Sequence, residues 1–236
     1  MSTDQVKGCE TMITRRSFIG GIIGGVATFF GIEGYLKVKD ETIAELLAEM
    51  YGRCGGDEIP TSDYIRWLTK VPANPERYIT PDDPVVQEYA RKIDIDIISE
   101  GRFGYFITPP ELKFEYETDS EQFGKGDEWQ MPRDYLLSGG VGDCEDYTLA
   151  IASIFEAKNF PARVVCGVVR GRKNDPDKPH AVVETVIDDY EYIMDVSWPR
   201  TILSEDKYRR RVYKWKPLAM FGKNMSYRLY HSSWDL

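Results

Sequence analysis

Apolar residues recur every three or four positions in three stretches of the first hundred residues, a spacing that predicts amphipathic helices. The first stretch spans residues 40–54 and stops at Gly55-Gly56. The second covers about residues 62–71, and the third follows Pro84. The apolar positions of the first are Ile43, Leu46, Leu47, Met50, Tyr51 and Cys54, and those of the third are Val85, Val86, Tyr89, Ala90 and Ile93. We interpret all three as helices that cover a core.

The pattern is mixed over about residues 99–129, where Pro109-Pro110 and an acidic, Gly-rich turn at 124–127 interrupt it. We predict loop with short strands in this segment. Its aromatic residues include Phe103, Tyr105, Phe106, Phe114 and Tyr116. Packing against the core explains them most simply, and lining a substrate groove is the alternative.

The second half has a clearer pattern. Residues 143–158 predict a helix that Asp143 can cap, with Leu149, Ala150, Ser153, Ile154 and Ala157 facing inward. Strands are predicted over residues 162–169, 181–187 and 190–196. The last two are joined by Asp188-Asp189, a two-residue hairpin turn.

This turn sets the register of the hairpin. If Ile187 pairs with Tyr190, His180 lies opposite Ser197, and Asp195 is two residues from that partner. Residues two apart on a strand share a face, so His180 and Asp195 become diagonal neighbours with Cα atoms roughly 7 Å apart. A three-residue turn without a bulge would put the two side chains on opposite faces.

The first 36 residues have the features of an export signal. Arg15-Arg16 precede an uncharged, Gly-rich run from Phe18 to Ile32, which is similar to a twin-arginine signal. As a helix, this run would span roughly 22 Å, less than the ~30 Å of a bilayer core. The alternative is a membrane anchor, and no Ala-x-Ala cleavage site follows Ile32. We divide the chain into residues 1–36, signal or anchor, and 37–236, one domain that works outside the cytoplasm.

Size and charge narrow the class of partner. The chain has 236 residues and 42% hydrophobic residues, which suits one packed domain. Its net charge of −9 argues against nucleic acid, because phosphate binding requires clustered Lys and Arg. The one basic cluster, residues 209–211, is interpreted as a solvated strand or loop face.

The four cysteines do not form a disulfide scaffold in a chain of this length. Cys9 precedes the signal, and Cys54 and Cys166 fit buried, inert thiols, with a bridge between these two left open. Cys144 differs because it has polar neighbours and begins a helix. Unpaired N–H groups and the helix dipole favour an anion there, so we expect the pKa of its thiol to be lowered.

Cys144, His180 and Asp195 follow one another in the order of nucleophile, base and orienting carboxylate. Taken singly, each has a simpler explanation: a small core residue, a satisfied polar group and a surface acid. Helix start, spacing and strand parity together favour catalysis. His231, the other histidine, lies in the C-terminal tail and is a poor candidate for the base. We expect the acidic neighbours Asp143, Glu145 and Asp146 to cap the helix or hold the loop rather than face the thiol.

The sequence Gly142-Asp143-Cys144-Glu145-Asp146, with His180 opening one strand and Asp195 ending the next, resembles the transglutaminase-like superfamily of cysteine proteases. The resemblance extends upstream through residues 128–132 and covers about residues 75–200. It implies a papain-like α+β fold, with the nucleophile at the N-terminus of a helix packed on an antiparallel sheet. It also implies Cys144 as nucleophile, His180 as general acid and base, and Asp195 as its orienter. By the same analogy, Trp129 or Gln130 would assist the Cys144 N–H in binding the oxyanion.

The resemblance implies a cysteine protease or amidase that hydrolyses peptide or isopeptide bonds of a protein or peptide substrate, at the cell surface or cell wall. Amide transfer to an amine, and a non-catalytic envelope binding or scaffold protein, are the alternatives. No cofactor is expected. Exported relatives can require calcium, and oxygen ligands are available at Asp143, Glu145, Asp146, Asp188 and Asp189. The N-terminal segment would contact the membrane if it is not cleaved.

Overall fold

The computed structural model describes residues 71–72, 74–98, 103–124 and 128–230, without the side chains of 226–229. The predicted signal and the first two predicted helices lie outside these residues, apart from the last residue of the second. Cys9, Cys54 and His231 lie outside them as well. Between Pro72 and the C-terminus the described residues form one compact unit.

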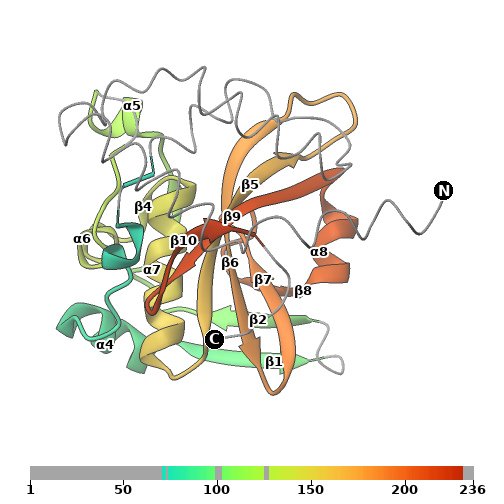
Figure 1. The fold of residues 1–236 in the computed structure, drawn as a ribbon. Helices are drawn as coiled ribbons and strands as arrows, with labels where there is room; N and C mark the ends of the chain where they lie inside the picture. Colours follow the sequence, from blue (N-terminus) through green and yellow to red (C-terminus); the bar gives the residue numbers. More distant parts are fainter. Residues whose placement is uncertain (1–70, 73, 99–102, 125–127, 231–236) are drawn as a thin grey trace, which may run out of the picture. The chain divides into compact units, whose positions relative to one another are not determined.

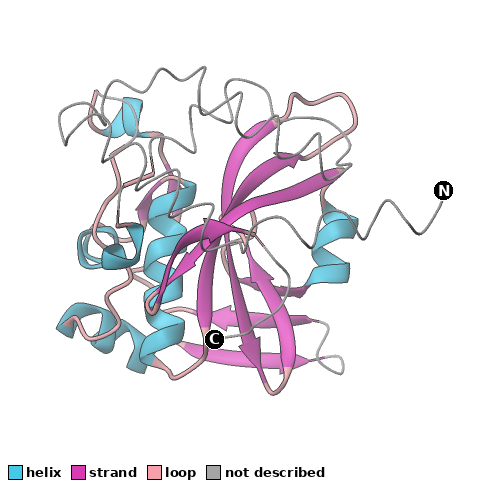
Figure 2. Ribbon diagram, viewed as in Figure 1, coloured by secondary structure: helices cyan, strands magenta, loops and turns pink. Residues whose placement is uncertain are grey.

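The centre of this unit is an eight-stranded antiparallel sheet (Figures 1 and 2). Its strands lie in the order β1-β2-β8-β7-β6-β5-β9-β10. Their bounds are β1 Asp94–Ile98, β2 Phe103–Ile107, β5 Ala162–Arg170, β6 Lys178–Ile187, β7 Tyr190–Met194, β8 Thr201–Ser204, β9 Lys214–Gly222 and β10 Met225–Leu229. A separate parallel pair joins β3 Glu115–Tyr116 to β4 Val141–Gly142.

Helix α7 packs against β5 and β6, and α4 and α6 pack against α7 (Figure 1). Helix α8 contacts β7 and β8. The helical bounds are η2 Pro75–Tyr78, α4 Pro84–Lys92, α5 Asp119–Gln122, α6 Pro132–Leu137, α7 Cys144–Ala157 and α8 Glu205–Arg211. In α7 every residue from Cys144 to Phe155 is buried. A helix that is covered on all sides belongs to the core, and α7 therefore forms the central helix against the sheet.

The predicted α+β architecture is confirmed, with Cys144 as the first residue of a helix on an antiparallel sheet. The helix after Pro84 is confirmed as α4, and it buries Val86, Tyr89 and Ala90. The hairpin turn is also confirmed, because Ile187 pairs with Tyr190. Asp188 and Asp189 have φ angles of 50° and 65°, as a type I′ turn requires at both central positions.

The described part of segment 99–129 is loop with the short strands β2 and β3, as predicted, together with the short helix α5. Two predictions differ from the structure, and strand β1, which pairs with β2, was not predicted. The cluster 209–211 ends helix α8 rather than a strand or loop. Its exposure was predicted, and ion pairs four residues apart, such as Arg210 with Asp206 at 3.0 Å, stabilise the helix. The strand predicted over 190–196 ends at Met194, where Asp195 leaves the ladder.

Two further residues considered in the sequence analysis lie in the core. Cys166 is a buried free thiol in β5, in keeping with the inert role predicted for it. Phe106 is 1% exposed and packs near Phe155 of α7, so this aromatic of segment 99–129 belongs to the core. Tyr105 and Tyr116 of the same segment are 46% and 55% exposed. The aromatic segment therefore serves both the core and the surface.

Candidate active site

Cys144 begins helix α7, and Asp143 is the N-cap of that helix. The backbone N–H of Asp143 donates to Oδ2 of Asp146 at 3.4 Å, within the capping arrangement of the first turn. Strand β4 leads directly into this turn. A Cβ on Gly142 would lie 2.5 Å from Oδ2 of Asp146 and 2.9 Å from Nε2 of Gln130. Only glycine therefore lets β4 approach the start of α7 so closely.

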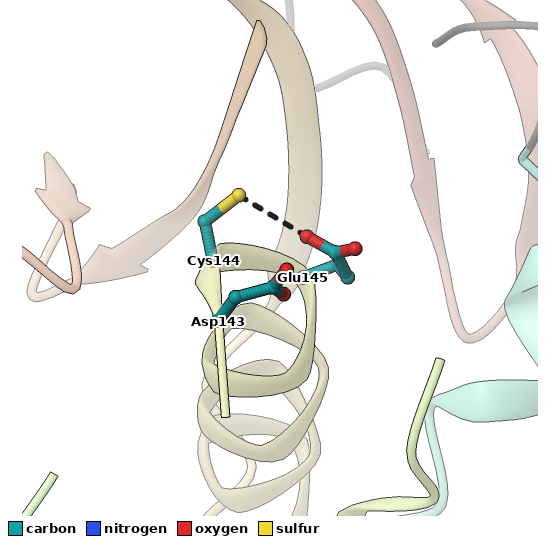
Figure 3. A group of neighbouring side chains, drawn as sticks. All are labelled: Asp143, Cys144 and Glu145. Atoms are coloured by element: carbon teal, nitrogen blue, oxygen red, sulfur yellow. Dashed lines mark hydrogen bonds between the residues drawn. The ribbon is translucent and has the colours of Figure 1, made fainter. Parts of the chain in front are cut away.

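The Cys144 thiol lies in a buried, acidic environment. Cys144 is 7% exposed, and its thiol donates a hydrogen bond to Oε2 of Glu145 at 3.2 Å. Figure 3 shows the carboxyl groups of Asp143 and Glu145 beside the sulfur at the end of the helix. Burial raises the pKa of the thiol well above its usual value, the charges of Glu145 and Asp143 raise it further, and a hydrogen bond from the backbone of Ala181 opposes them.

Two expectations about this thiol are therefore wrong. Its pKa is raised rather than lowered, and Glu145 faces the sulfur instead of only capping the helix. The start of a helix carries a partial charge of about half a proton. Burial together with two adjacent carboxyl groups outweighs that charge.

His180 and Asp195 meet as the strand parity predicts. Nε2 of His180 and Oδ2 of Asp195 are 2.9 Å apart, and both residues are buried. The Asp195 carboxylate also accepts the backbone N–H of Ser197 at 2.7 Å and the hydroxyl of Tyr208 at 2.7 Å. Burial alone would raise the pKa of Asp195, but the charge and hydrogen bond of His180, with the Ser197 and Tyr208 donors, hold it below its usual value.

The thiol lies near the part of strand β6 that carries His180. Ala181, whose backbone lowers the pKa of the Cys144 thiol, directly follows His180 in the chain. Since Nε2 of the imidazole bonds to Asp195, Nδ1 is the ring nitrogen left to serve the thiol. Trp215 packs edge-to-face against the imidazole, with ring centroids 6.4 Å apart. His180 and Asp195 are therefore in contact, and β6, which carries His180, packs against α7, which begins at Cys144.

Trp129 and Gln130, the predicted oxyanion donors, have other contacts. Nε2 of Gln130 donates to Oδ2 of Asp146 at 2.8 Å, and its backbone N–H donates to Oδ1 of the same residue at 2.8 Å. The Trp129 ring stacks on Phe221 at 5.9 Å and meets the edge of Tyr78 at 5.6 Å. Gln130 therefore holds the first turn of α7, and Trp129 packs toward β9 and η2.

A group of carboxylates lies beside the nucleophile. Oxygens of Asp119, Asp143 and Asp146 lie within 4.8 Å of one another. Burial, with smaller contributions from neighbouring carboxyls, raises the pKa of Asp143 to about 9 and that of Asp146 to about 7. Oδ1 of Asp143 is buried and has no hydrogen-bond partner among the described residues. Such an all-oxygen set suits a hard divalent cation.

Asp188 and Asp189 do not belong to this group. They form the turn after β6, eight residues beyond His180, so the strand carries them about 26 Å away at 3.3 Å per residue. Asp119 was missed from the sequence, because it lies far upstream in α5 and no local pattern links it to Asp143. Tyr208 was missed for the same reason, since only the packing of α8 brings its hydroxyl to Asp195.

Comparison with known proteins gave a family match that includes the candidate nucleophile and the candidate carboxylate. Residues 111–195 match the model of the transglutaminase-like superfamily. No curated protein was found to match the chain.

Among solved structures, calcium-bound LapG of Legionella pneumophila is 19% identical, with a TM-score of 0.38, over 84% of this chain and 94% of that chain. The EGTA-treated form of LapG is also 19% identical, with a TM-score of 0.38, over 84% and 88% of the two chains. At these identities and TM-scores we draw no functional conclusion from the likeness.

Proposed function

Since residues 111–195 match the model of the transglutaminase-like superfamily, we propose that this protein is an exported cysteine peptidase or amidase that hydrolyses amide bonds of a protein or peptide substrate. Cys144 is the nucleophile, His180 the general base and acid, and Asp195 the residue that orients the imidazole. The observation that carries the proposal is the 2.9 Å bond between His180 and Asp195, on a strand that packs against the helix that Cys144 begins.

The proposed reaction has two half-reactions. The sulfur forms a bond to the substrate carbonyl carbon while His180 takes the thiol proton, and the carbonyl electron pair moves onto oxygen. When the C=O bond re-forms, the C–N bond breaks and the amine leaves with the proton held by His180. Water, activated by the same imidazole, then cleaves the thioester. Asp195 stabilises the imidazolium through its bond to Nε2.

The raised pKa of the Cys144 thiol determines when the proton moves. A thiol with this pKa remains protonated near neutrality, so proton transfer to His180 accompanies attack and no stable ion pair precedes it. Glu145 accepts the hydrogen bond of the thiol at 3.2 Å and so stabilises the protonated sulfur before the reaction.

Calcium binding is part of the proposal. Asp119, Asp143 and Asp146 would hold the ion through carboxylate oxygens, as hard divalent cations prefer. A bound Ca²⁺ would supply positive charge beside the first turn of α7. The donor set supports this, since the buried oxygen Oδ1 of Asp143 has no other partner among the described residues. The ion's part is to hold this turn, and the covalent steps remain those of Cys144 and His180.

Export is proposed from residues 1–36 alone, on the paired arginines and the uncharged run that follows them. Among the described residues, no helix has the length and apolar character needed to cross a bilayer.

One observation favours a second candidate. A buried thiol with a raised pKa, hydrogen-bonded to a carboxyl group, also fits a non-catalytic envelope protein that uses this fold to bind a partner. The rate of Cys144 alkylation by iodoacetamide separates the two. In the enzyme, His180→Ala slows this alkylation near neutral pH, whereas in a binding protein it leaves the rate unchanged.

The decisive experiment measures peptide-library hydrolysis by the purified full chain, with calcium and with a chelator. Cys144→Ala and His180→Ala each abolish hydrolysis and covalent labelling by a thiol-directed peptide probe, while the circular dichroism spectrum stays the same. Hydrolysis that persists in Cys144→Ala would refute the proposal. Incorporation of a labelled amine in place of water would assign amide transfer as the reaction.

A further inference from the structure

Attack on an amide carbonyl creates a negative oxygen, and enzymes bind it with at least two hydrogen-bond donors. The backbone N–H of Cys144 at the helix start is one. Of the two donors suggested by the sequence, Gln130 is engaged with Asp146 at 2.8 Å, and the Trp129 ring packs against Phe221 and Tyr78. The other elements that border the thiol are therefore candidates for the second donor.

Strand β3 runs beside the segment that leads into the nucleophile. Tyr116 pairs with Gly142 in the parallel β3–β4 ladder. The backbone N–H groups of Glu115 and Glu117 donate to the carbonyls of Gly140 and Gly142 at 2.9 and 3.0 Å. Tyr116 is thus fixed by main-chain bonds opposite a residue only two positions before Cys144.

A second contact fixes β3 against helix α7. Phe114, the residue before β3, is buried and has a φ of 61°, a conformation that a bulky residue adopts only where its surroundings enforce it. Its ring meets the edge of Tyr147 at 5.4 Å between centroids. Tyr147 lies one turn after Cys144 in α7. Tyr116 and Cys144 therefore belong to one rigid arrangement.

The Tyr116 side chain is accessible, whereas the Cys144 side chain is buried. It is 55% exposed, whereas Cys144 is 7% exposed. Its hydroxyl makes no hydrogen bond to another described residue, so its proton is available to a substrate. Partial burial, with the charges of Cys144, Asp143 and Glu145, raises the pKa of this phenol, so it stays protonated and acts as a donor.

We propose that the hydroxyl of Tyr116 is the second oxyanion donor of this site and contacts the substrate carbonyl directly. The inference rests on the proposed function. As the S–C bond forms, the electron pair displaced onto the carbonyl oxygen accepts hydrogen bonds from the Cys144 N–H and the Tyr116 O–H. Neither donor loses its proton, and the same bonds hold the oxygen until the C–N bond breaks.

The test compares two reactions of the Cys144 sulfur in the full chain. Acylation by 4-nitrophenyl acetate passes through an oxyanion, while alkylation by iodoacetamide does not. Tyr116→Phe slows acylation about 100-fold and changes alkylation by about twofold or less, because one oxyanion donor is typically worth 10²–10³ in rate. Tyr190→Phe, at a tyrosine of equal exposure (54%) on β7, is the control and leaves both rates unchanged.

Equal acylation rates in Tyr116→Phe and the unmodified protein would overturn the inference, as would an equal loss of both reactions, which indicates a structural role. Trp129→Phe is measured alongside. A loss of acylation there, with Tyr116→Phe unaffected, assigns the donor to Trp129 and also overturns the inference. Acylation that persists in Cys144→Ala refutes the proposed function itself, so the two failures are distinguishable.

Discussion

The hydroxyl of Tyr208 donates a hydrogen bond to Oδ2 of Asp195 at 2.7 Å, the same oxygen that bonds to Nε2 of His180. Tyr208 is fully buried in α8 and packs edge-to-face with Trp215, with ring centroids 5.9 Å apart. Trp215 in turn meets the edge of the imidazole. Tyr208 is therefore a positioning residue that fixes the carboxylate and, through it, His180.

Tyr208→Phe lowers kcat by about 10-fold, because the imidazole is held less firmly in its productive orientation. It also removes one of the donors that hold down the pKa of Asp195, so the acid limb of the pH–rate profile moves to higher pH. The stability loss is about 1–3 kcal/mol, the cost of a charge-assisted hydrogen bond. Steady-state kinetics from pH 4 to 8 and denaturant unfolding measure these effects.

Tyr192→Phe is the matched control. The Tyr192 hydroxyl is buried without a hydrogen-bond partner among the described residues, so its removal costs no interaction. Stability stays equal or rises, and the pH profile does not move. An unshifted acid limb in Tyr208→Phe would assign that tyrosine a packing role alone.

The parts of the site that the sequence predicts are those with a local cause. Helical periodicity places Cys144 at the start of α7, and a two-residue turn sets the register that brings His180 to Asp195. Each depends on residues close in the chain, and each is confirmed by the structure. Local rules were sufficient because strand parity and helix phase are set within a few residues.

The parts that depend on tertiary packing were not predictable. Strand β1 directly follows α4, and its pairing with β2 has no sequence signal beyond a short alternation. Glu145 turns toward the thiol, and Asp119 joins Asp143 from a distant element. The direction of the Cys144 pKa shift depends on these side chains and on burial. A helix-start argument alone therefore gave the wrong sign.

The acidic group predicts how stability depends on pH when calcium is chelated. The pKa values of Asp146 and Asp143 are raised to about 7 and about 9 in the folded protein, above the ~3.9 expected when unfolded. The folded state thus binds the extra protons. The stabilisation that these two groups contribute is complete below about pH 4. It is lost as the pH rises through about 7 for Asp146 and about 9 for Asp143.

Both groups lose their extra protons between pH 5 and 9, so the thermal midpoint falls over this range in chelator. Calcium reverses the fall most strongly at the alkaline end, because ion and proton compete for the same oxygens. Differential scanning fluorimetry measures both effects. Asp146→Asn flattens the profile, whereas substitution of the exposed Asp206 by Asn does not. A midpoint that calcium leaves unchanged at every pH would contradict the cation site.

Gly142→Ala tests the close approach of β4 to the nucleophile. The new methyl would lie 2.5 Å from Oδ2 of Asp146, so the bonds of Asp146 to Gln130 must move. We expect a loss of about 1–3 kcal/mol in the free energy of unfolding, as for other overpacked sites. Gly171→Ala, whose methyl would meet Oδ2 of Asp175 at 3.3 Å on an exposed turn, costs about 0.5 kcal/mol or less. Equal losses in the two variants would remove the steric argument.

Arg163 and Glu184 form a buried ion pair between β5 and β6, at 2.6 Å and with side chains 1% and 9% exposed. Burial raises the pKa of Glu184, and the charge and hydrogen bond of Arg163 oppose this. Glu184→Ala leaves the guanidinium without its carboxylate and costs about 3–5 kcal/mol in urea unfolding. The double variant Arg163→Met with Glu184→Leu recovers at least half of that loss, because no buried charge remains.

Asp206→Ala, which breaks an exposed pair with Arg210, costs about 0.5 kcal/mol or less and sets the scale of a surface ion pair. A double variant as unstable as the single one would mean that packing, rather than the unpaired charge, sets the cost.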